Sequence, residues 1–358
     1  MSEDLEYLKK LVGSLLIVGF DGPRLTASCR NYLEQWDLGG VILFKRNIQS
    51  LEQVASLNTL IEETAAVPPV ISVDHEGGKV FRLPEPFTPF PPMRGVGDKF
   101  LKDRNPELAE EVGRAMGREL RAAGFNLDYA PVLDVNSNPS NPIIGERAFG
   151  SDPQEVAELG AAFLEGLEEV GVLGCGKHFP GHGDTFEDSH ETLPKVDKSR
   201  MDLNACELIP FKEAVARQFP MIMTAHVLYP QLDKDWPATL SEKILTGILR
   251  EEFAYEGLIV SDDLFMKGIL EHWSLVEAAE RFLRVGGDMV LLCHKEEAQR
   301  RVAAHLVHLA EKDHEFRDAL EIKRKRVEAL RQRLTLGAQP ELLARYQSDH
   351  QELIKKIS

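Results

Sequence analysis

The sequence is poor in cysteine and has no long apolar run. Its four cysteines, Cys29, Cys175, Cys206 and Cys293, lie far apart and form no CxxC pair. We therefore expect reduced, mostly buried thiols and no disulfide framework. No stretch reaches the roughly 20 apolar residues that a membrane-spanning helix needs. Residues 1–6 are acidic and polar, whereas a secretory leader begins with basic residues before an apolar segment. These absences predict a cytoplasmic protein without membrane contact.

Positive charge is also in deficit. The chain has 42 Lys and Arg against 58 Asp and Glu, a formal net charge of −16 at pH 7. Such a chain repels a phosphate backbone unless a local basic patch intervenes. The one dense basic cluster, residues 323–326, lies in a helical pattern rich in acidic residues, and this is typical of a solvated helix face. The sequence thus predicts no nucleic-acid partner.

Eight short apolar runs alternate with amphipathic helical patterns. They cover residues 15–18, 40–44, 69–73, 127–132, 172–175, 221–224, 258–261 and 289–292. Near-continuous apolarity is typical of parallel strands buried on both faces, and eight strand–helix repeats predict an α/β protein with a single (β/α)8 TIM-type barrel. An open doubly wound sheet is the alternative, but no GxGxxG motif follows the first run. We expect the barrel over residues 1–310 and a helical extension over 311–358, packed on the barrel.

Polar residues follow the end of every run. They are Asp21, Lys45, Arg46, Asp74, His75, Glu76, Asp134, Lys177, His178, His226, Asp262, Asp263, His294 and Lys295. The carboxyl ends of barrel strands converge on one pocket, so this pattern predicts an active site there. The densest segment is residues 177–190, which combines three histidines, several carboxylates and two glycines. We interpret it as an active-site loop.

Two groups of residues point to a specific chemistry. Asp262 ends a buried run without an adjacent Lys or Arg, and an ionised carboxylate at the base of a pocket can attack or stabilise a cationic centre, as in sugar hydrolysis. The alternative role, capping the next helix, we assign to Asp263. A nucleophile of this kind needs a proton donor for the leaving oxygen. His190 can supply the proton, with Asp188 fixing its tautomer.

Two other classes of site compete with this interpretation. His178, His182, Asp184, Asp188 and His190 could together hold zinc or a similar ion. Against a metal, the chain has no HxH or HExxH pair, and Lys177 would place a positive charge beside the ion. A catalytically inactive sugar-binding module is disfavoured because both catalytic groups are present. We expect neither a metal nor an organic cofactor.

Four motifs carry a family resemblance. They span residues 74–83, 145–150, 177–190 and 261–266, in that order. With them the sequence resembles glycoside hydrolase family 3, and within it the bacterial β-N-acetylglucosaminidases, over roughly residues 10 to 300. The resemblance differs at His75, where Gln is common, and at Phe81, where Thr or Ser is common. Both positions lie beside binding residues.

The resemblance implies an activity and a role for each site residue. Asp262 would be the nucleophile, His190 the acid/base and Asp188 its dyad partner. The N-acetylglucosamine unit would be bound by Asp74, Arg82, Arg147, Lys177 and His178. The implied enzyme is a retaining hydrolase of peptidoglycan fragments that acts through a glycosyl-aspartate intermediate. The aglycone and a phosphorylase alternative stay open, and we expect a monomer or weak dimer.

Overall fold

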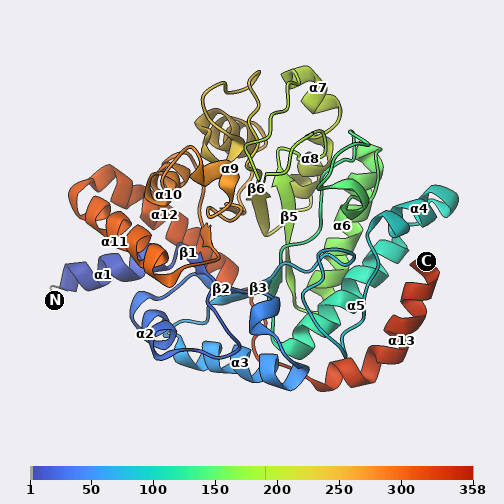
Figure 1. The fold of residues 1–358 in the computed structure, drawn as a ribbon, viewed down its shortest axis with the longest axis horizontal. Coiled ribbons are helices and arrows are strands. Elements are labelled where there is room, and N and C mark those ends of the chain that lie inside the picture. Colours follow the sequence, from blue (N-terminus) through green and yellow to red (C-terminus); the bar gives the residue numbers. More distant parts are fainter. Residues whose placement is uncertain (1–2, 190, 358) are drawn as a thin grey trace.

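Eight parallel strands form one barrel in the computed structural model, which describes residues 3–189 and 191–357. The strands are β1 (Leu16–Val18), β2 (Gly40–Leu43), β3 (Val70–Val73), β4 (Leu127–Asp128), β5 (Leu173–Phe179), β6 (Met221–Thr224), β7 (Leu258–Val260) and β8 (Val290–Leu292). Their order in the sheet is β7-β6-β5-β4-β3-β2-β1-β8. A parallel bridge between Val260 and Met289 joins β7 to the start of β8 and closes the ring. The predicted (β/α)8 barrel is confirmed (Figure 1).

Each predicted run contains a strand, but two strands differ from their predicted length. The fourth run yields only the two residues of β4, whereas β5 continues to Phe179. Pro131 explains the short β4, because proline has no N–H to donate to a ladder. Pairing resumes beyond it as an isolated bridge between Val132 and Lys177. The chain after β4 is therefore irregular where it reaches the carboxyl end of the barrel.

Helices surround the barrel (Figure 1). The α-helices are α1 (Glu3–Gly13), α2 (Ala27–Trp36), α3 (Leu51–Thr64), α4 (Arg94–Asp103), α5 (Glu107–Ala123), α6 (Pro153–Glu169), α7 (Arg200–Ala205), α8 (Ile209–Ala216), α9 (Lys267–Leu270), α10 (Leu275–Arg284), α11 (Glu296–Lys312), α12 (His314–Arg331) and α13 (Glu341–Ile357). Three 3-10 turns, η1 (Lys45–Asn47), η2 (Gly145–Arg147) and η3 (Ala238–Leu240), and a π-helix, η4 (Lys243–Glu252), complete the described part of the chain. Within that part, no helix combines the length and apolarity needed to cross a membrane.

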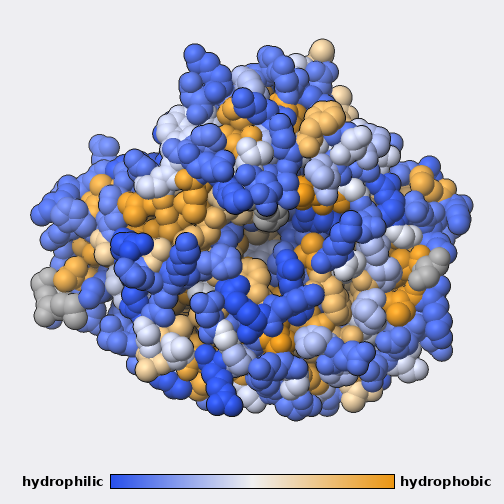
Figure 2. All heavy atoms as spheres, in the orientation of Figure 1, coloured by the Kyte–Doolittle hydropathy of each residue, from blue (hydrophilic) through white to orange (hydrophobic). Residues whose placement is uncertain are grey.

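The core lies inside the barrel and between the barrel and its helices. Every residue of the eight strands is buried, as expected for parallel strands covered on both faces. Helices α5 and α6 pack closely because Gly113 and Gly166 face the partner backbone. A Cβ at Gly113 would lie 2.1 Å from the carbonyl oxygen of Phe163. The outer face in Figure 2 is mostly hydrophilic, with hydrophobic side chains in small groups between charged ones.

The C-terminal residues form two helices on different sides of the barrel. Helix α12 packs near β7 and α1, and α13 lies along α5 (Figure 1). The predicted solvated face at residues 323–326 is wrong for Lys323, which is buried close to Asp288. Burial lowers the pKa of the Lys323 ammonium to about 8, although Asp288 opposes the shift. The sequence pattern missed this because the acidic partner lies on another element. The boundary at residue 310 stays a prediction.

Candidate active site

A cavity of about 330 Å³ lies at the carboxyl ends of the barrel strands. It brings together six of the eight predicted site residues: Asp74, Arg82, Arg147, Lys177, His178 and Asp262. Asp74 and Arg82 follow β3, Arg147 follows β4, and Asp262 follows β7, whereas Lys177 and His178 lie at the end of β5. Segments distant in sequence therefore meet in one space. Asp188 does not line the cavity but belongs to the loop that contributes Ser189 to its wall. His190 lies outside the described residues.

The floor on the β3 side is an ion-pair cluster built around Lys177. Its Nζ lies 2.5 Å from Asp74 Oδ1 and 2.5 Å from Glu76 Oε1. Burial would lower the pKa of Lys177, but the two carboxylates outweigh burial and raise it. Arg82 extends the cluster, with Nη2 3.1 Å from Asp74 Oδ2. The lysine therefore stays charged.

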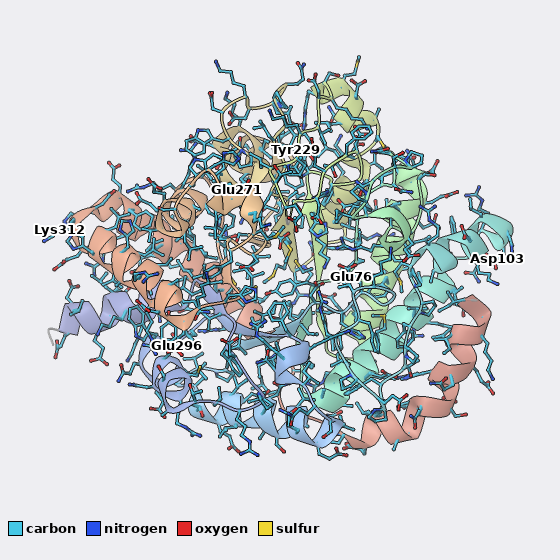
Figure 3. The ribbon with its side chains drawn as sticks, viewed as in Figure 1. Glu76, Asp103, Tyr229, Glu271, Glu296 and Lys312 are labelled. Atoms are coloured by element: carbon cyan, nitrogen blue, oxygen red, sulfur yellow. The ribbon has the colours of Figure 1, made fainter. Side chains whose placement is uncertain are left out.

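Glu76 is a functional candidate that our sequence-based roles omitted. Arg147, from η2, donates Nε and Nη2 to the two Glu76 oxygens, both at 2.7 Å. Figure 3 places Glu76 near the centre of the molecule. Burial alone would raise its pKa, but the charges of Arg147 and Lys177 outweigh burial and hold the pKa well below the usual range. The sequence feature that could have identified Glu76 was its place in the motif at residues 74–83, two residues after Asp74.

Three cations and two carboxylates thus meet on this side of the cavity. They are Arg82, Lys177 and Arg147 against Asp74 and Glu76. Charge-assisted donors and acceptors in fixed positions suit a ligand with several hydroxyl groups, because each hydroxyl can both donate and accept. The network also holds each side chain in place before a ligand arrives. This side of the cavity can bind a sugar.

A second polar centre lies at the end of β5. His178 Nδ1 lies 2.6 Å from Asp134 Oδ2, and Asp134 Oδ1 accepts the backbone N–H groups of His178 and His182. Burial would raise the pKa of Asp134, but His178 and His182 together outweigh burial and lower the pKa. The carboxylate therefore orients the imidazole and leaves Nε2 for a ligand. In the sequence, the only feature that indicated a functional role for Asp134 was its position after the fourth apolar run.

The loop after β5 is held by its own side chains. His182 Nε2 lies 2.9 Å from Ser189 Oγ, and Nδ1 lies 3.0 Å from Thr185 Oγ1. Burial, aided by His178, lowers the pKa of His182 to about 4, so the ring is neutral at pH 7. Among residues 3–189 and 191–357, no group of three or more His, Cys, Asp or Glu side chains is arranged to hold a metal.

Asp262 and Asp263 have different environments. Asp262 lines the cavity, and its Oδ1 accepts the Asp263 N–H at 2.7 Å. Asp263 Oδ1 accepts the N–H groups of Phe265 and Cys293, both at 3.1 Å, and burial raises the pKa of Asp263 to about 6. The predicted helix cap at Asp263 is wrong, since α9 begins later with Met266 at its N-cap. The carboxylate instead ties the turn after β7 to the end of β8.

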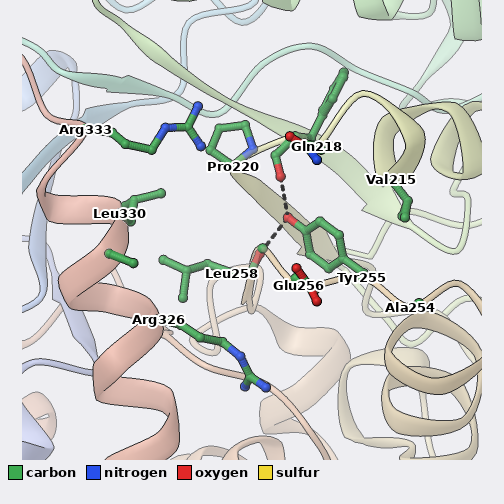
Figure 4. A pocket seen from close by; sticks show the side chains of 13 residues that line it. Val215, Gln218, Pro220, Ala254, Tyr255, Glu256, Leu258, Arg326, Leu330 and Arg333 are labelled. Atoms are coloured by element: carbon green, nitrogen blue, oxygen red, sulfur yellow. Dashed lines mark hydrogen bonds between the residues drawn. The ribbon is translucent and has the colours of Figure 1, made fainter.

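A cavity of about 390 Å³ lies at the opposite end of the barrel (Figure 4). Its wall includes residues that precede β6 and β7, and the Tyr255 hydroxyl lies 3.0 and 3.2 Å from the carbonyl oxygens of Phe219 and Leu258. Its charged lining residues are Glu256, Arg326 and Arg333. This set has neither a histidine nor a pair of carboxylates. It therefore lacks the groups for acid–base chemistry with a carboxylate nucleophile.

Known proteins resemble the chain along most of its length. The model of the glycosyl hydrolase family 3 N-terminal domain matches residues 7–330. A β-hexosaminidase of Nitrosospira multiformis is 41% identical over 295 residues, which cover 81% of this chain and 83% of the relative. A β-hexosaminidase of Thiobacillus denitrificans is 40% identical over 293 residues, 81% of each chain.

Solved structures agree with this likeness. A glycoside hydrolase family 3 β-N-acetylglucosaminidase from Paenibacillus sp. str. FPU-7 has a TM-score of 0.89 at 37% identity, covering 98% of this chain and 68% of that one. NagZ from Neisseria gonorrhoeae in complex with N-trifluoroacetyl-D-glucosamine has a TM-score of 0.82 at 32% identity, and the match covers 96% of this chain and 98% of that one. The same Neisseria protein in complex with zinc ion has a TM-score of 0.79 at 34% identity, covering 96% of each chain.

The barrel, its charged cavity and these relatives define the class of protein: the chain is a glycoside hydrolase. Within that class, the chain belongs to glycosyl hydrolase family 3.

Proposed function

We propose that the enzyme is a retaining β-N-acetylglucosaminidase that works by double displacement. Asp262 is the nucleophile, His190 the acid/base and Asp188 the partner that orients His190. The observation that carries the proposal is that Asp262 lines one cavity together with Asp74, Arg82, Arg147 and Lys177. Glu76 joins these residues into one cluster through its ion pairs with Arg147 and Lys177. The names of the relatives, β-hexosaminidase and β-N-acetylglucosaminidase, support the same activity.

The ion-pair cluster binds the terminal sugar. Arg82 and Lys177 both pair with the carboxylate of Asp74. Together the three side chains can bind neighbouring sugar hydroxyls through charge-assisted hydrogen bonds. His178, oriented by Asp134, offers its second ring nitrogen to the same sugar. These groups are already paired with one another, so little reorganisation is needed when the substrate binds. That preorganisation favours the transition state.

The chemistry proceeds in two balanced steps. In the first, an Asp262 oxygen attacks the anomeric carbon, the bond to the aglycone oxygen breaks, and that oxygen takes a proton from His190. In the second, His190 takes a proton from water, the water oxygen attacks the anomeric carbon, and the ester bond to Asp262 breaks. Two inversions at one carbon give net retention. The first sugar released is the β-anomer.

We extend the proposal to the natural substrate, a peptidoglycan fragment that carries terminal β-linked N-acetylglucosamine and is degraded in the cytoplasm during cell-wall recycling. This extension rests on the resemblance to bacterial enzymes that act on imported cell-wall fragments. Specificity constants for an N-acetylglucosaminyl-anhydromuramyl peptide and for chitobiose test it. A preference for chitobiose would refute the extension while leaving the reaction itself intact.

Stereochemistry and trapping test the mechanism together. Proton NMR recorded before mutarotation should show β-N-acetylglucosamine first, and a 5-fluoro donor should trap an ester on Asp262 that mass spectrometry can locate. Early α-anomer would refute double displacement. Retention without an adduct on Asp262 would indicate attack by the substrate's own acetamido oxygen. A sugar 1-phosphate formed in added phosphate would instead establish a phosphorylase.

A further inference from the structure

Helix α13 contacts the loop at residues 83–93, which lies between β3 and α4. We propose that His350, on α13, is a positioning residue for substrate binding, and that it acts through Glu119 and the loop at residues 83–93. This inference rests on the proposed function, because it assigns the segment after β3 to sugar binding. The family 3 match ends at residue 330, so α13 lies beyond it. A role for this helix in the reaction is therefore additional to the family's barrel.

The first link is a buried carboxylate shared by the helix and the loop. His350 Nδ1 lies 2.8 Å from Glu119 Oε1, and the Thr88 N–H donates to Glu119 Oε2 at 2.8 Å. His350 and Glu119 are almost fully buried. His350 Nε2 has no hydrogen-bond partner within residues 3–189 and 191–357, so Nδ1 carries the polar contact of this ring. One glutamate thus connects α13 to the backbone of the loop.

Further contacts join α13 to the same loop. The His350 and Phe90 rings lie 6.2 Å apart between centroids, and Gln347 Nε2 donates to the Pro86 carbonyl oxygen at 3.2 Å. Helix α13 also packs along α4 and α5, the two helices that follow the loop in sequence (Figure 1). Residues 83–93 contain neither helix nor strand. Contacts with neighbouring elements therefore set the path of this loop.

The second link runs from the loop to the turn that carries Glu76. The Gly78 N–H donates to the Phe90 carbonyl oxygen at 2.8 Å. Gly77 has φ +85°, and a Cβ there would lie 2.8 Å from the Pro91 carbonyl oxygen, so the turn and the loop are in direct backbone contact. The Glu76 N–H in turn donates to the Val80 carbonyl oxygen at 2.9 Å. A shift of the loop would therefore move this turn.

The turn leads directly into the sugar-binding cluster. Glu76 pairs with Arg147 and Lys177, and Arg82, two residues after Val80, pairs with Asp74. A misplacement of about 1 Å at a binding group can cost about 100-fold in rate. Removing His350 leaves Glu119 Oε1 without the donor that His350 supplied, and a buried carboxylate that loses a partner must rearrange. The rearrangement would displace Thr88, the loop and the turn.

Kinetics of full-length variants test this role. With p-nitrophenyl N-acetylglucosaminide, we expect His350→Ala to lower kcat/KM by about 10-fold or more, mainly through a higher KM, because the displaced groups bind the substrate. His350→Asn should recover most of the loss, since its amide nitrogen can donate to Glu119 as Nδ1 does. Lys356→Ala is the matched control. Lys356 lies on the same helix and pairs with Glu111 on the surface, 3.0 Å away.

Gln347→Ala keeps the test decisive if His350→Ala does not fold. Gln347 is on the helix surface, and its loss removes only the contact to Pro86, so we expect a KM increase of about two-fold or more with an unchanged unfolding temperature. Unchanged constants in folded His350→Ala, or in Gln347→Ala, would overturn the inference. So would an equal KM increase in Lys356→Ala, or no recovery in His350→Asn. An inactive wild-type enzyme would instead refute the proposed function.

Discussion

Replacing Glu76 by glutamine tests whether the buried ion-pair cluster supports both folding and sugar binding. Glu76 accepts two hydrogen bonds from Arg147 and pairs with Lys177, and all three side chains are largely buried. Glutamine has nearly the same shape but no charge. Its NH2 group would face a guanidinium or ammonium donor, so at least one of these contacts becomes repulsive. The cluster would then hold three cations against one carboxylate, Asp74.

The expected loss of stability follows from the burial of these charges. Breaking a buried ion pair by removing one partner costs about 3–5 kcal/mol, because the remaining charges are left uncompensated. For a chain of 358 residues, each kcal/mol lowers the unfolding temperature by about 1.3 °C. We therefore expect Glu76→Gln to unfold about 4–7 °C below wild type. Its kcat/KM should fall by about 100-fold, since Arg147 and Lys177 lose their fixed positions.

The pH dependence of the unfolding temperature provides a second test, because the direction of the change with pH is defined. Arg147 and Lys177 hold the pKa of folded Glu76 below its unfolded value, so its stabilising contribution is fully present above about pH 4.3. That contribution is lost as pH falls towards the lowered folded pKa. The difference in unfolding temperature between wild type and Glu76→Gln should therefore be constant from pH 9 to about pH 5 and should narrow below about pH 4.

Differential scanning calorimetry and steady-state kinetics measure these effects, with Glu146→Gln as the matched control. Glu146 pairs with Lys79 at 3.4 Å, but the side chains are 44% and 77% exposed, so this substitution should cost less than about 1 kcal/mol. Glu76→Gln with an unfolding temperature within about 1 °C of wild type and an unchanged kcat/KM would refute the reasoning. An equal loss in Glu146→Gln would show that burial does not determine the effect.

Three further predictions concern the catalytic groups. Asp262→Asn should fold normally and lose about 1,000-fold or more in kcat, because its amide cannot form the glycosyl ester; near-native turnover would move the nucleophile elsewhere, first to Asp263. His190→Ala should lower the rate of hydrolysis by about 100-fold or more for substrates with poor leaving groups, and much less for activated aryl glycosides. Asp188→Ala should show the same dependence on the leaving group and should also shift the pH optimum. A uniform loss across leaving groups, or an unshifted optimum, would remove the residue concerned from the dyad. Activity should survive exhaustive treatment with EDTA, whereas a loss restored by zinc would establish the metal alternative.

The barrel could be predicted because its signal is local. Each strand is a short apolar run bounded by turn residues, and burial on both faces leaves the same pattern eight times. The strand lengths were less predictable. Strand β4 (Leu127–Asp128) is shorter than β5 (Leu173–Phe179) because Pro131 interrupts the hydrogen-bond ladder of β4. The cost of that interruption depends on the neighbouring strand.

The binding cavity could be predicted in part for the same reason. Parallel strands place their carboxyl ends at one edge, so Asp74, Lys177, His178 and Asp262 were expected to meet, and all four line the cavity. Their partners could not be predicted in this way. Glu76 and Arg147 are 71 positions apart, and Asp134 and His178 are 44 apart. Which carboxylate meets which cation depends on loop paths that have no periodic signal.

The sequence by itself determined the family, the barrel and the position of the candidate site, because these follow from short motifs and from the direction of parallel strands. Only the tertiary structure decided how the charges pair. It buried Lys323 near Asp288, turned Asp263 towards β8, and joined His350 on α13 to Glu119, 231 positions away. The physical reason is distance in space. Burial and charge pairing depend on which segments meet, and that is settled only when the whole chain has folded.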